Sequence, residues 1–354
     1  MKLLIVTQKV DQNDDVLGFF HEWIREFSKK WNKVIVIALK LGEYNFPSNV
    51  KILSLGKEKG LSKLSWLLNF YKYIWRERNN YEAVFVHMNP RYIPIGWPIW
   101  RIFGKIISFW YAHGHVPLML RIADKLTDVA FASTPEGYRL KSRKLKIVGQ
   151  GIDVENFKNS QRLHDENKPF KIVSVGRISP SKDYKTLINA VAEFKKTGMD
   201  NFLIEIAGQP ATDADKSYLS NLQKKIVEKG LAERFKFIGP IPNKDLSIFL
   251  NTANLFVNMG HTGSLDKANL EAMACGLPVL TCNEAYENIF GEYKNLLMYQ
   301  KKDFDELAKK IQHFITAPES EKQKIGEDLR LIVVKDHNLE GLINKITEIL
   351  QSKI

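Results

Sequence analysis

The chain has 354 residues, of which 44% are hydrophobic and 26% are charged, a composition typical of a folded globular protein with about two domains. It has no apolar run long enough for a transmembrane helix, its apolar start at residues 3–6 is too short for a signal peptide, and its two cysteines offer no disulfide framework. We therefore expect a cytoplasmic protein.

The net charge of +12 is unevenly distributed. Residues 1–150 contain 24 Lys and Arg against 12 Asp and Glu, whereas residues 151–354 contain 28 of each kind. This excess predicts an anionic partner for the first half alone, and the candidates are membrane lipid, a phosphorylated acceptor and nucleic acid. The chain shows no recognition helix, zinc-ligand spacing or aromatic RNA-binding motif, which argues against nucleic acid.

The first half alternates strand-like and helical segments. Continuous apolar runs, typical of parallel strands that are buried on both faces, predict strands at residues 3–7, 34–38, 52–55, 83–87, 106–111, 129–133 and 145–148. Apolar spacing predicts an amphipathic helix over residues 18–30. Gly18 at its start would let a phosphate approach the helix amides, while Asp11, Asp14 and Asp15 before it either contact hydroxyl groups or cap the helix.

Residues 63–76 repeat apolar side chains at helical spacing between Lys and Arg residues, and residues 141–144 add a second basic cluster. Two interpretations stay open. Exposed aromatic groups among these cations would rest on an anionic membrane. Alternatively, Trp66, Phe70 and Ile74 face the core and the cations are solvated.

His113 and His115 flank a glycine just after the strand predicted at residues 106–111. Active-site groups collect beyond the carboxyl ends of parallel strands, and a histidine there can donate or accept a proton near a reacting oxygen. His113 is the main candidate and His115 the secondary one. Core packing is the alternative, and zinc is disfavoured because no third ligand has suitable spacing.

A polar stretch at residues 158–168 predicts a linker, and a second series of strands is predicted at residues 172–175, 203–207, 235–238, 255–258 and 278–281. The expected fold class is α/β, with Rossmann-like domains at residues 1–160 and 168–335 whose parallel sheets face each other across a ligand-binding cleft. Residues 336–354 predict a C-terminal helix that can pack back towards the first domain.

Two cations follow the first strand of the second domain. Gly176 and Arg177 come directly after the strand at residues 172–175, and Lys182 lies on the loop into the next helix. A guanidinium fork and an ammonium group at this edge of a sheet suit a diphosphate. The alternative is a solvated loop.

The run at residues 269–279 places Glu271 early in an apolar helix that ends near Gly276. Free amides and the positive dipole end at a helix start suit a phosphate. A nearby carboxylate can then bind the hydroxyls of a ribose. The alternative is a buried helix with a Schellman-type glycine stop.

Glu271-Ala272-Met273 and residues 276–279, with Gly176-Arg177 and Lys182, resemble the donor-nucleotide motif of glycosyltransferase family 4, the retaining sugar transferases of GT-B fold. The resemblance is good over roughly residues 145–300 and loose in the first domain. It implies transfer from a nucleoside-diphosphate sugar to a glycan or lipid-linked acceptor without a cofactor. The donor-binding residues are then Gly18, Gly176, Arg177, Lys182, Gly239, Ser264, Leu265, Lys267 and Glu271, and the catalytic residues are His113, Arg177, Lys182 and Asp266.

The sequence departs from this family at Gly263, where relatives usually have a glutamate that faces the donor sugar. Asp266 can supply the carboxylate from a shifted place, or the amides of residues 264–267 hold the donor, although Asp266 would also make an ordinary helix N-cap. A non-catalytic nucleotide-sugar-binding protein and a GT-B epimerase are the alternatives.

Asp213 and Asp215 match the Asp-x-Asp pair that binds a metal-diphosphate in the other main transferase fold, but acidic residues at a helix start are ordinary. We therefore expect no metal. The basic first domain is expected to lie on the inner face of the cell membrane and to receive the acceptor there.

Overall fold

The computed structural model describes residues 1–159, 168–260 and 263–354. Most of the predicted linker, as well as His261 and Thr262 beside the predicted site, lie outside the described residues. The described chain divides into two compact units. Unit 1 comprises Met1–Asp153, Pro242–Lys244 and His337–Ile354, and unit 2 comprises Val154–Ile241 and Asp245–Asp336.

Unit 1 is built on a seven-stranded sheet whose neighbouring strands all run parallel. In spatial order the strands are β3 (Val50–Ser54), β2 (Lys33–Leu41), β1 (Lys2–Val10), β4 (Ala83–His87), β5 (Ile106–Trp110), β6 (Val129–Ala132) and β7 (Leu145–Ile147). The central strand β4 is buried along its whole length, as expected for a parallel strand covered on both faces.

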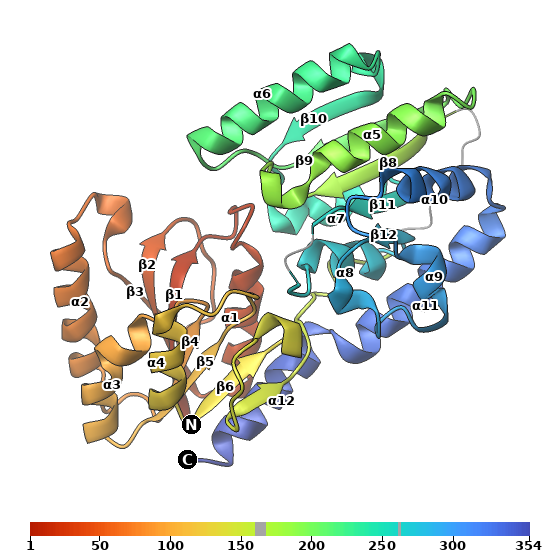
Figure 1. Ribbon diagram of the computed structural model, residues 1–354. Coiled ribbons are helices and arrows are strands. Elements are labelled where there is room, and N and C mark those ends of the chain that lie inside the picture. Colours follow the sequence, from red (N-terminus) through yellow and green to blue (C-terminus); the bar gives the residue numbers. More distant parts are fainter. Residues whose placement is uncertain (160–167, 261–262) are drawn as a thin grey trace. The chain divides into compact units, whose positions relative to one another are not determined.

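Helices cover both faces of this sheet (Figure 1). On one face, α1 (Phe19–Lys30) packs with the C-terminal helix α12 (Leu339–Gln351). The indole of Trp31, at the end of α1, donates a hydrogen bond to Thr347 Oγ1 of α12 at 3.2 Å, which ties these two helices together. On the other face lie α2 (Lys63–Arg76), α3 (Tyr92–Ile102) and α4 (Leu118–Leu126).

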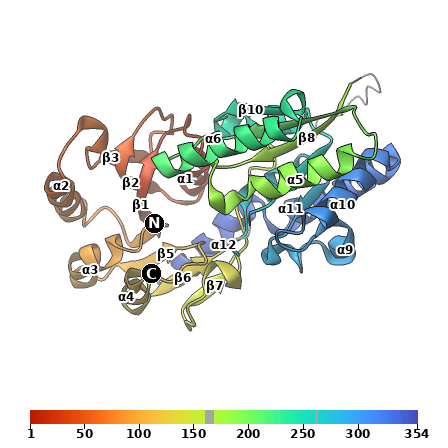
Figure 2. The same cartoon turned by 45° about the horizontal axis from the view of Figure 1, so that its top comes forward.

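Unit 2 contains a five-stranded parallel sheet. Its strands are, in spatial order, β10 (Phe235–Gly239), β9 (Phe202–Ala207), β8 (Phe170–Val175), β11 (Leu255–Asn258) and β12 (Val279–Thr281). Its helices are α5 (Tyr184–Lys195), α6 (Asp213–Glu228), α7 (Leu246–Leu250), α8 (Lys267–Ala274), α9 (Lys294–Leu297), α10 (Phe304–Thr316) and α11 (Glu319–Asp336). Helices α5 and α10 pack side by side (Figure 2), and α8 packs against α7 and α11.

The predicted α/β class with two parallel sheets is confirmed. The strand predicted over residues 52–55 is displaced, because pairing with β2 orders the polar residue Lys51 as well as its apolar neighbours in β3. Of the three side chains in α2 that sequence alone left open, Phe70 and Ile74 are buried in the core and Trp66 packs partly buried against it.

Candidate active site

Three glycines meet where β8, β9 and β10 end. A Cβ atom on Gly208 would lie 2.0 Å from the carbonyl oxygen of Gly176, so only glycine fits at this position. The amide of Gly208 donates to the carbonyl of Gly239 at 2.8 Å. The main chains of Gly176, Gly208 and Gly239 thus lie close together at the carboxyl edge of the sheet, where a ligand can approach the backbone.

Arg177 follows Gly176 directly and its side chain is exposed. Within the described ranges of the chain, its guanidinium group has no hydrogen-bond or ion-pair partner. The fork of donors is therefore available to an anion at the end of β8.

Lys182 lies in the turn that leads into α5, and its ammonium group forms an ion pair and hydrogen bond with Oδ2 of Asp266. The side-chain amide of Asn258, the last residue of β11, donates to the same oxygen at 3.0 Å. A Cβ on Gly176 would lie 3.1 Å from Cε of Lys182, so the bare glycine backbone makes room for the lysine. This Lys182 cluster (Lys182, Asp266 and Asn258) joins the ends of β8 and β11.

The Asp266 carboxylate is held in its ionised form. Burial acts to raise the pKa of Asp266, but the charge and hydrogen bond of Lys182, together with the Asn258 amide, hold the pKa below its ordinary value of 3.8. At neutral pH the cluster therefore contains a charged pair.

Asp266 is also the N-cap of α8, since its Oδ1 accepts from the amide of Ala268 at 3.4 Å. The prediction that Glu271 lies early in its helix is therefore wrong: the cap starts α8 at Lys267, and Glu271 lies in the second turn, 4% exposed. The helix ends in a Schellman motif, in which Leu277 N donates to Ala272 O at 3.0 Å and Gly276 has a φ of 71°.

Glu271 and Asp266 share a neighbour in Tyr286. The Tyr286 hydroxyl donates to the carbonyl of Asp266 at 2.6 Å. Burial, with the negative charges of Asp266 and Glu271, holds the pKa of Tyr286 well above its ordinary value. The two predicted site carboxylates thus lie around one buried phenol that stays protonated.

The segment before α8 is ordered by backbone contacts. Gly263 has a φ of 73°, a conformation that glycine enters freely, so the backbone here suits the glycine that replaces the expected glutamate. The carbonyl of Ser264 accepts from the side chain of Asn283 at 2.8 Å, and Leu265 is buried. Ser264, Leu265 and Lys267 therefore lie beside the Lys182 cluster.

In unit 1, His113 lies three residues beyond the end of β5, and its ring is exposed. The amide of His115 donates to Nδ1 of His113 at 3.2 Å, while the amide of His113 donates to the carbonyl of Gly137 at 2.9 Å. Because Nδ1 accepts a hydrogen bond, the neutral ring carries its proton on Nε2, which makes Nε2 a donor.

The start of α1 already holds an anionic group. The carboxylate of Asp14 accepts from the amides of Val16 and Leu17 at 2.9 and 2.6 Å, and it pairs with Lys9. A Cβ on Gly18 would lie 2.4 Å from the carbonyl oxygen of Asp14, so this glycine lets the loop turn tightly into α1. A phosphate at Gly18 would therefore have to displace Asp14.

Asp213 and Asp215 take part in the start of α6. Asp215 completes a capping box with Thr212, and Asp213 pairs with Lys216 at 2.8 Å. Across the part of the chain that the structure describes, no group of three or more His, Cys, Asp or Glu side chains could hold a metal ion.

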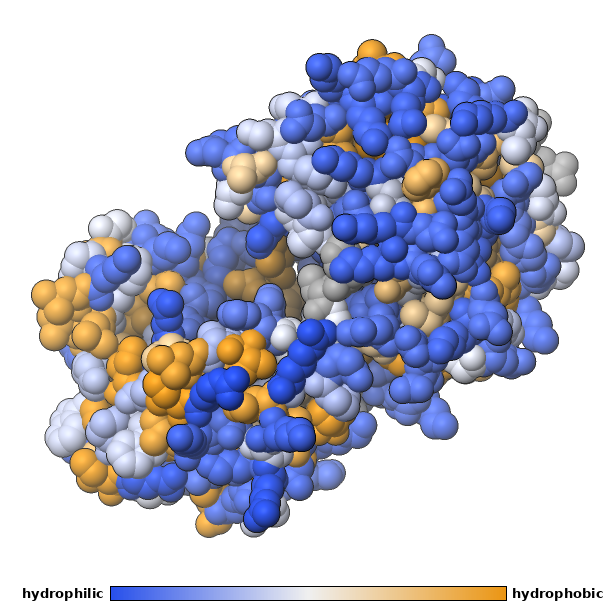
Figure 3. All heavy atoms as spheres, viewed as in Figure 1, coloured by the Kyte–Doolittle hydropathy of each residue, from blue (hydrophilic) through white to orange (hydrophobic). Residues whose placement is uncertain are grey.

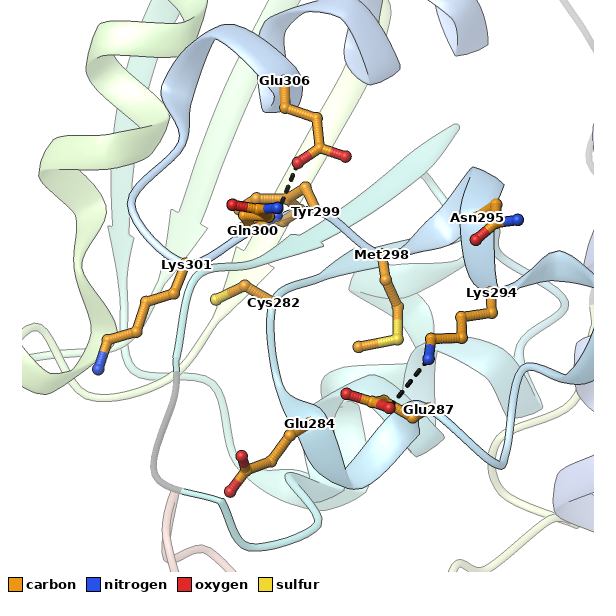
Figure 4. A pocket seen from close by; sticks show the side chains of 10 residues that line it. All are labelled: Cys282, Glu284, Glu287, Lys294, Asn295, Met298, Tyr299, Gln300, Lys301 and Glu306. Atoms are coloured by element: carbon orange, nitrogen blue, oxygen red, sulfur yellow. Dashed lines mark hydrogen bonds and ion pairs between the residues drawn. The ribbon is translucent and has the colours of Figure 1, made fainter.

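A cavity of about 430 Å³ lies beyond the end of β12 (Figure 4). Cys282 lines this cavity, and its thiol lies 3.5 Å from the carbonyl oxygen of Met259. Met259 directly follows Asn258, the residue of the Lys182 cluster that ends β11. Three carboxylates line this cavity against two ammonium groups, and one of these, Lys294, is paired with Glu287 at 2.9 Å. This charge balance disfavours a diphosphate in the cavity.

Sequence reasoning missed three residues that shape the site: Asn258, Asn283 and Tyr286. The Asn258 side chain both holds Asp266 and accepts from the amide of Gly260 at 2.7 Å. A polar residue that ends an apolar predicted strand is the signal that could have identified Asn258. Asn283 and Tyr286 act through backbone carbonyls, which leave no such signal.

Solved structures with a similar fold include HepE from Anabaena in complex with UDP, with a TM-score of 0.78 and 17% identity over 99% of this chain and 100% of that one. Sucrose-phosphate synthase from Thermosynechococcus elongatus has a TM-score of 0.77 and 16% identity over 99% of both chains. The two parallel sheets, of seven and five strands, and the likeness to these structures place the chain in the GT-B class of fold.

Residues 153–331, just over half of the chain, match the family described as glycosyl transferases group 1, and the chain belongs to this family. It is similar to alpha-monoglucosyldiacylglycerol synthase from Acholeplasma laidlawii, with 26% identity over 62% of this chain and 54% of that protein. It is also similar to D-inositol 3-phosphate glycosyltransferase from Corynebacterium jeikeium, with 28% identity over 44% of this chain and 39% of that protein. The chain thus spans about half or less of the length of these curated relatives.

A helix needs about 20 predominantly apolar residues to cross a bilayer. In the described ranges, no helix is long and apolar enough to cross a membrane.

Proposed function

We propose that this protein is a retaining glycosyltransferase that moves a hexose from a nucleoside-diphosphate sugar to a hydroxyl acceptor. The observation that carries the proposal is the placement of Lys182 beside the start of α8, with Arg177 at the end of β8, inside the segment that matches the family. The proposed donor-binding residues are Gly176, Arg177, Lys182, Gly239, Ser264, Leu265, Lys267 and Glu271, with Gly18 as a candidate from unit 1.

The diphosphate of the donor competes for Lys182. Its phosphate oxygens take the place of Asp266 at the ammonium group, and the fork of Arg177 binds from the end of β8. Two cations and the start of α8 then balance the diphosphate charge without a metal ion. The released Asp266 can hydrogen-bond to the donor sugar in place of the glutamate that is missing at Gly263, while Glu271 binds the ribose hydroxyls.

In the reaction, the bond between the anomeric carbon and the diphosphate oxygen breaks, and the acceptor oxygen bonds to that carbon on the same face. The acceptor proton passes to the leaving diphosphate. Arg177 and Lys182 stabilise the charge that develops on the leaving group, and the Nε2 proton of His113 hydrogen-bonds a reacting oxygen. Catalysis thus depends on positioning and electrostatics.

The proposed acceptor is a lipid-linked or membrane-proximal saccharide. The Acholeplasma laidlawii relative is named for the synthesis of a glycolipid. The cation excess of residues 1–150 favours the same conclusion, because unit 1 would be attracted to the anionic inner face of the cell membrane. This attraction should weaken as salt rises.

A thermal-shift panel of nucleotide sugars with a chelator present tests the proposal. A ligand at 100 times its dissociation constant adds about 2.7 kcal/mol of stability, so at least one donor should raise the melting temperature. Product analysis then separates the outcomes. A glycoside of retained configuration supports transfer, an epimerised nucleotide sugar indicates an epimerase, and binding without turnover indicates a non-catalytic protein.

A further inference from the structure

The outer face of α2 carries a stripe of exposed apolar side chains. Leu64, Leu68, Tyr71 and Trp75 recur at the spacing of one helix face, and their exposed fractions are 65%, 60%, 37% and 53%. Apolar groups gather over α2 at the left edge of Figure 3. We call these four residues the α2 stripe.

The α2 stripe is not the side of the helix that packs on the sheet. The opposite side of α2 does this through Phe70 and Ile74, which are buried in the core shared with α3 and α4. A surface helix of a water-soluble fold normally presents polar residues to solvent. An apolar row on the outer side marks a contact with something other than water.

The charges around the stripe indicate what that contact is. Helix α2 contains Lys63, Lys72 and Arg76 and no acidic residue. The acid that follows it, Glu77, is 3% exposed and is paired with Lys51 and Arg76. Lys63 and Lys72 have no acidic partner in the described part of the chain. A helix with apolar groups on its outer side and two such cations is complementary to a surface that is apolar inside and anionic at its rim.

The aromatic residues of the stripe fit the same kind of surface. The indole of Trp75 packs edge-on against Phe103, with ring centroids 5.6 Å apart, and the guanidinium of Arg78 lies 4.7 Å from the Trp75 ring. Tyr and Trp concentrate at the boundary between lipid headgroups and acyl chains, where one part of the ring is apolar and another is wet.

We infer that α2 is a membrane-docking helix that lies in the plane of an anionic bilayer, with the α2 stripe inserted at the headgroup boundary and Lys63 and Lys72 on lipid phosphates. This inference deepens the proposed function, because it names the element that would hold unit 1 at a membrane-bound acceptor. It concerns lipid binding, which is measured without turnover.

Vesicle sedimentation of the full chain tests it, with phosphatidylglycerol–phosphatidylcholine vesicles against pure phosphatidylcholine. The main variant carries Leu64→Gln, Leu68→Gln and Trp75→Gln, since glutamine keeps helix propensity. Its matched control carries Val227→Gln, Ile248→Gln and Leu331→Gln, whose side chains are about as exposed but lie on α6, α7 and α11 of unit 2. Melting temperatures of both variants verify folding.

The wild type and the control should sediment with the anionic vesicles, and the stripe variant should bind them at least about tenfold more weakly. Lys63→Gln with Lys72→Gln should remove the salt-sensitive part of the binding. Brominated lipid in the vesicles should quench the tryptophan fluorescence of the wild type more than that of Trp75→Phe. Equal binding by the stripe variant, or no binding by the wild type, would overturn the inference.

Two further results distinguish membrane docking from self-association through α2 and from the proposed function. A wild-type dimer in sedimentation velocity that the stripe variant loses, without vesicle binding, would make α2 a self-association surface and overturn the inference. Thermal shifts with nucleotide sugars should be equal in the wild type and the stripe variant. If the protein binds the vesicles but no nucleotide sugar, the proposed function is wrong and the assignment of α2 as a docking helix is still supported.

Discussion

Lys182 and Asp266 form an ion pair at the carboxyl edge of the five-stranded sheet, although 84 residues separate them in the chain. The pair joins the two residues that sequence reasoning assigned to different tasks, one to the diphosphate and one to the donor sugar. Since Lys182 cannot give its full charge to both Asp266 and a phosphate, donor binding and release of Asp266 should be coupled.

The cations beside this pair should contribute most when the leaving group becomes charged. We expect Arg177→Ala and Lys182→Ala each to cost about 1.5–3 kcal/mol in transition-state binding, the scale of a hydrogen bond between charged groups. Steady-state kinetics with the donor varied measure this as a fall in kcat/KM. Lys224→Ala, an exposed lysine on α6, is the control. Wild-type kcat/KM in both site variants would contradict the assignment.

The ion pair should also be visible in the pH dependence of stability. The pKa of Asp266 in the fold lies below its ordinary value of 3.8, so its contribution is present above that pH and is lost as the pH falls through the lower pKa. The wild type should therefore lose its advantage over Asp266→Asn in unfolding free energy as the pH falls below about 4. Chemical denaturation at several pH values measures the difference. A difference that is constant with pH would show that the charge does not contribute.

The sequence predicts the bounds of some strands better than those of others. The runs at residues 83–87 and 255–258 predict strands with the bounds that β4 and β11 have, because continuous β-branched and aromatic residues there are buried on both faces. The edge strand β3 is half exposed, so its ends follow from pairing with β2 rather than from apolarity.

In the site, the sequence places Arg177 and Lys182 correctly beyond β8, because a Gly-Arg after an apolar strand is a local signal. The partnership of Lys182 with Asp266 has no local signal, since it depends on how β8 and β11 pair. The side chains that form the α2 stripe were left undecided for a related reason. Two apolar stripes on one helix look alike in sequence until packing decides which one faces the core.

His113 should affect turnover more than donor binding. Its ring follows β5 in unit 1, whereas the donor residues belong to unit 2. We expect His113→Ala to lower kcat by about 100-fold or more, the usual scale for a group that acts on a reacting oxygen, and to leave the donor dissociation constant nearly unchanged. His115→Ala is the matched control, because the amide that supports His113 is retained. If kcat stays at the wild-type value in His113→Ala, the residue has no role in the reaction.

The close approach of Gly208 to Gly176 should be visible in stability. Gly208 and Gly198 both have positive φ angles, but a Cβ on Gly198 meets no atom within 4 Å, whereas one on Gly208 lies 2.0 Å from a carbonyl oxygen. Gly198→Ala should cost about 1–2 kcal/mol for the backbone alone, and Gly208→Ala about 1–3 kcal/mol more for overpacking. Urea unfolding measures the unfolding free energy of both variants. An equal loss of unfolding free energy in the two would contradict the close contact between Gly208 and Gly176.

We propose above all that unit 2 binds a nucleoside-diphosphate sugar and that Glu271 binds its ribose. Calorimetric titration of the nucleotide sugar that gives the largest thermal shift, into the wild type, Glu271→Gln and the exposed control Glu233→Gln, tests it most directly. We expect equal binding by the wild type and Glu233→Gln. Binding by folded Glu271→Gln should be about tenfold weaker or more, the loss expected for a charge-assisted hydrogen bond. Equal donor affinity in all three proteins would contradict it.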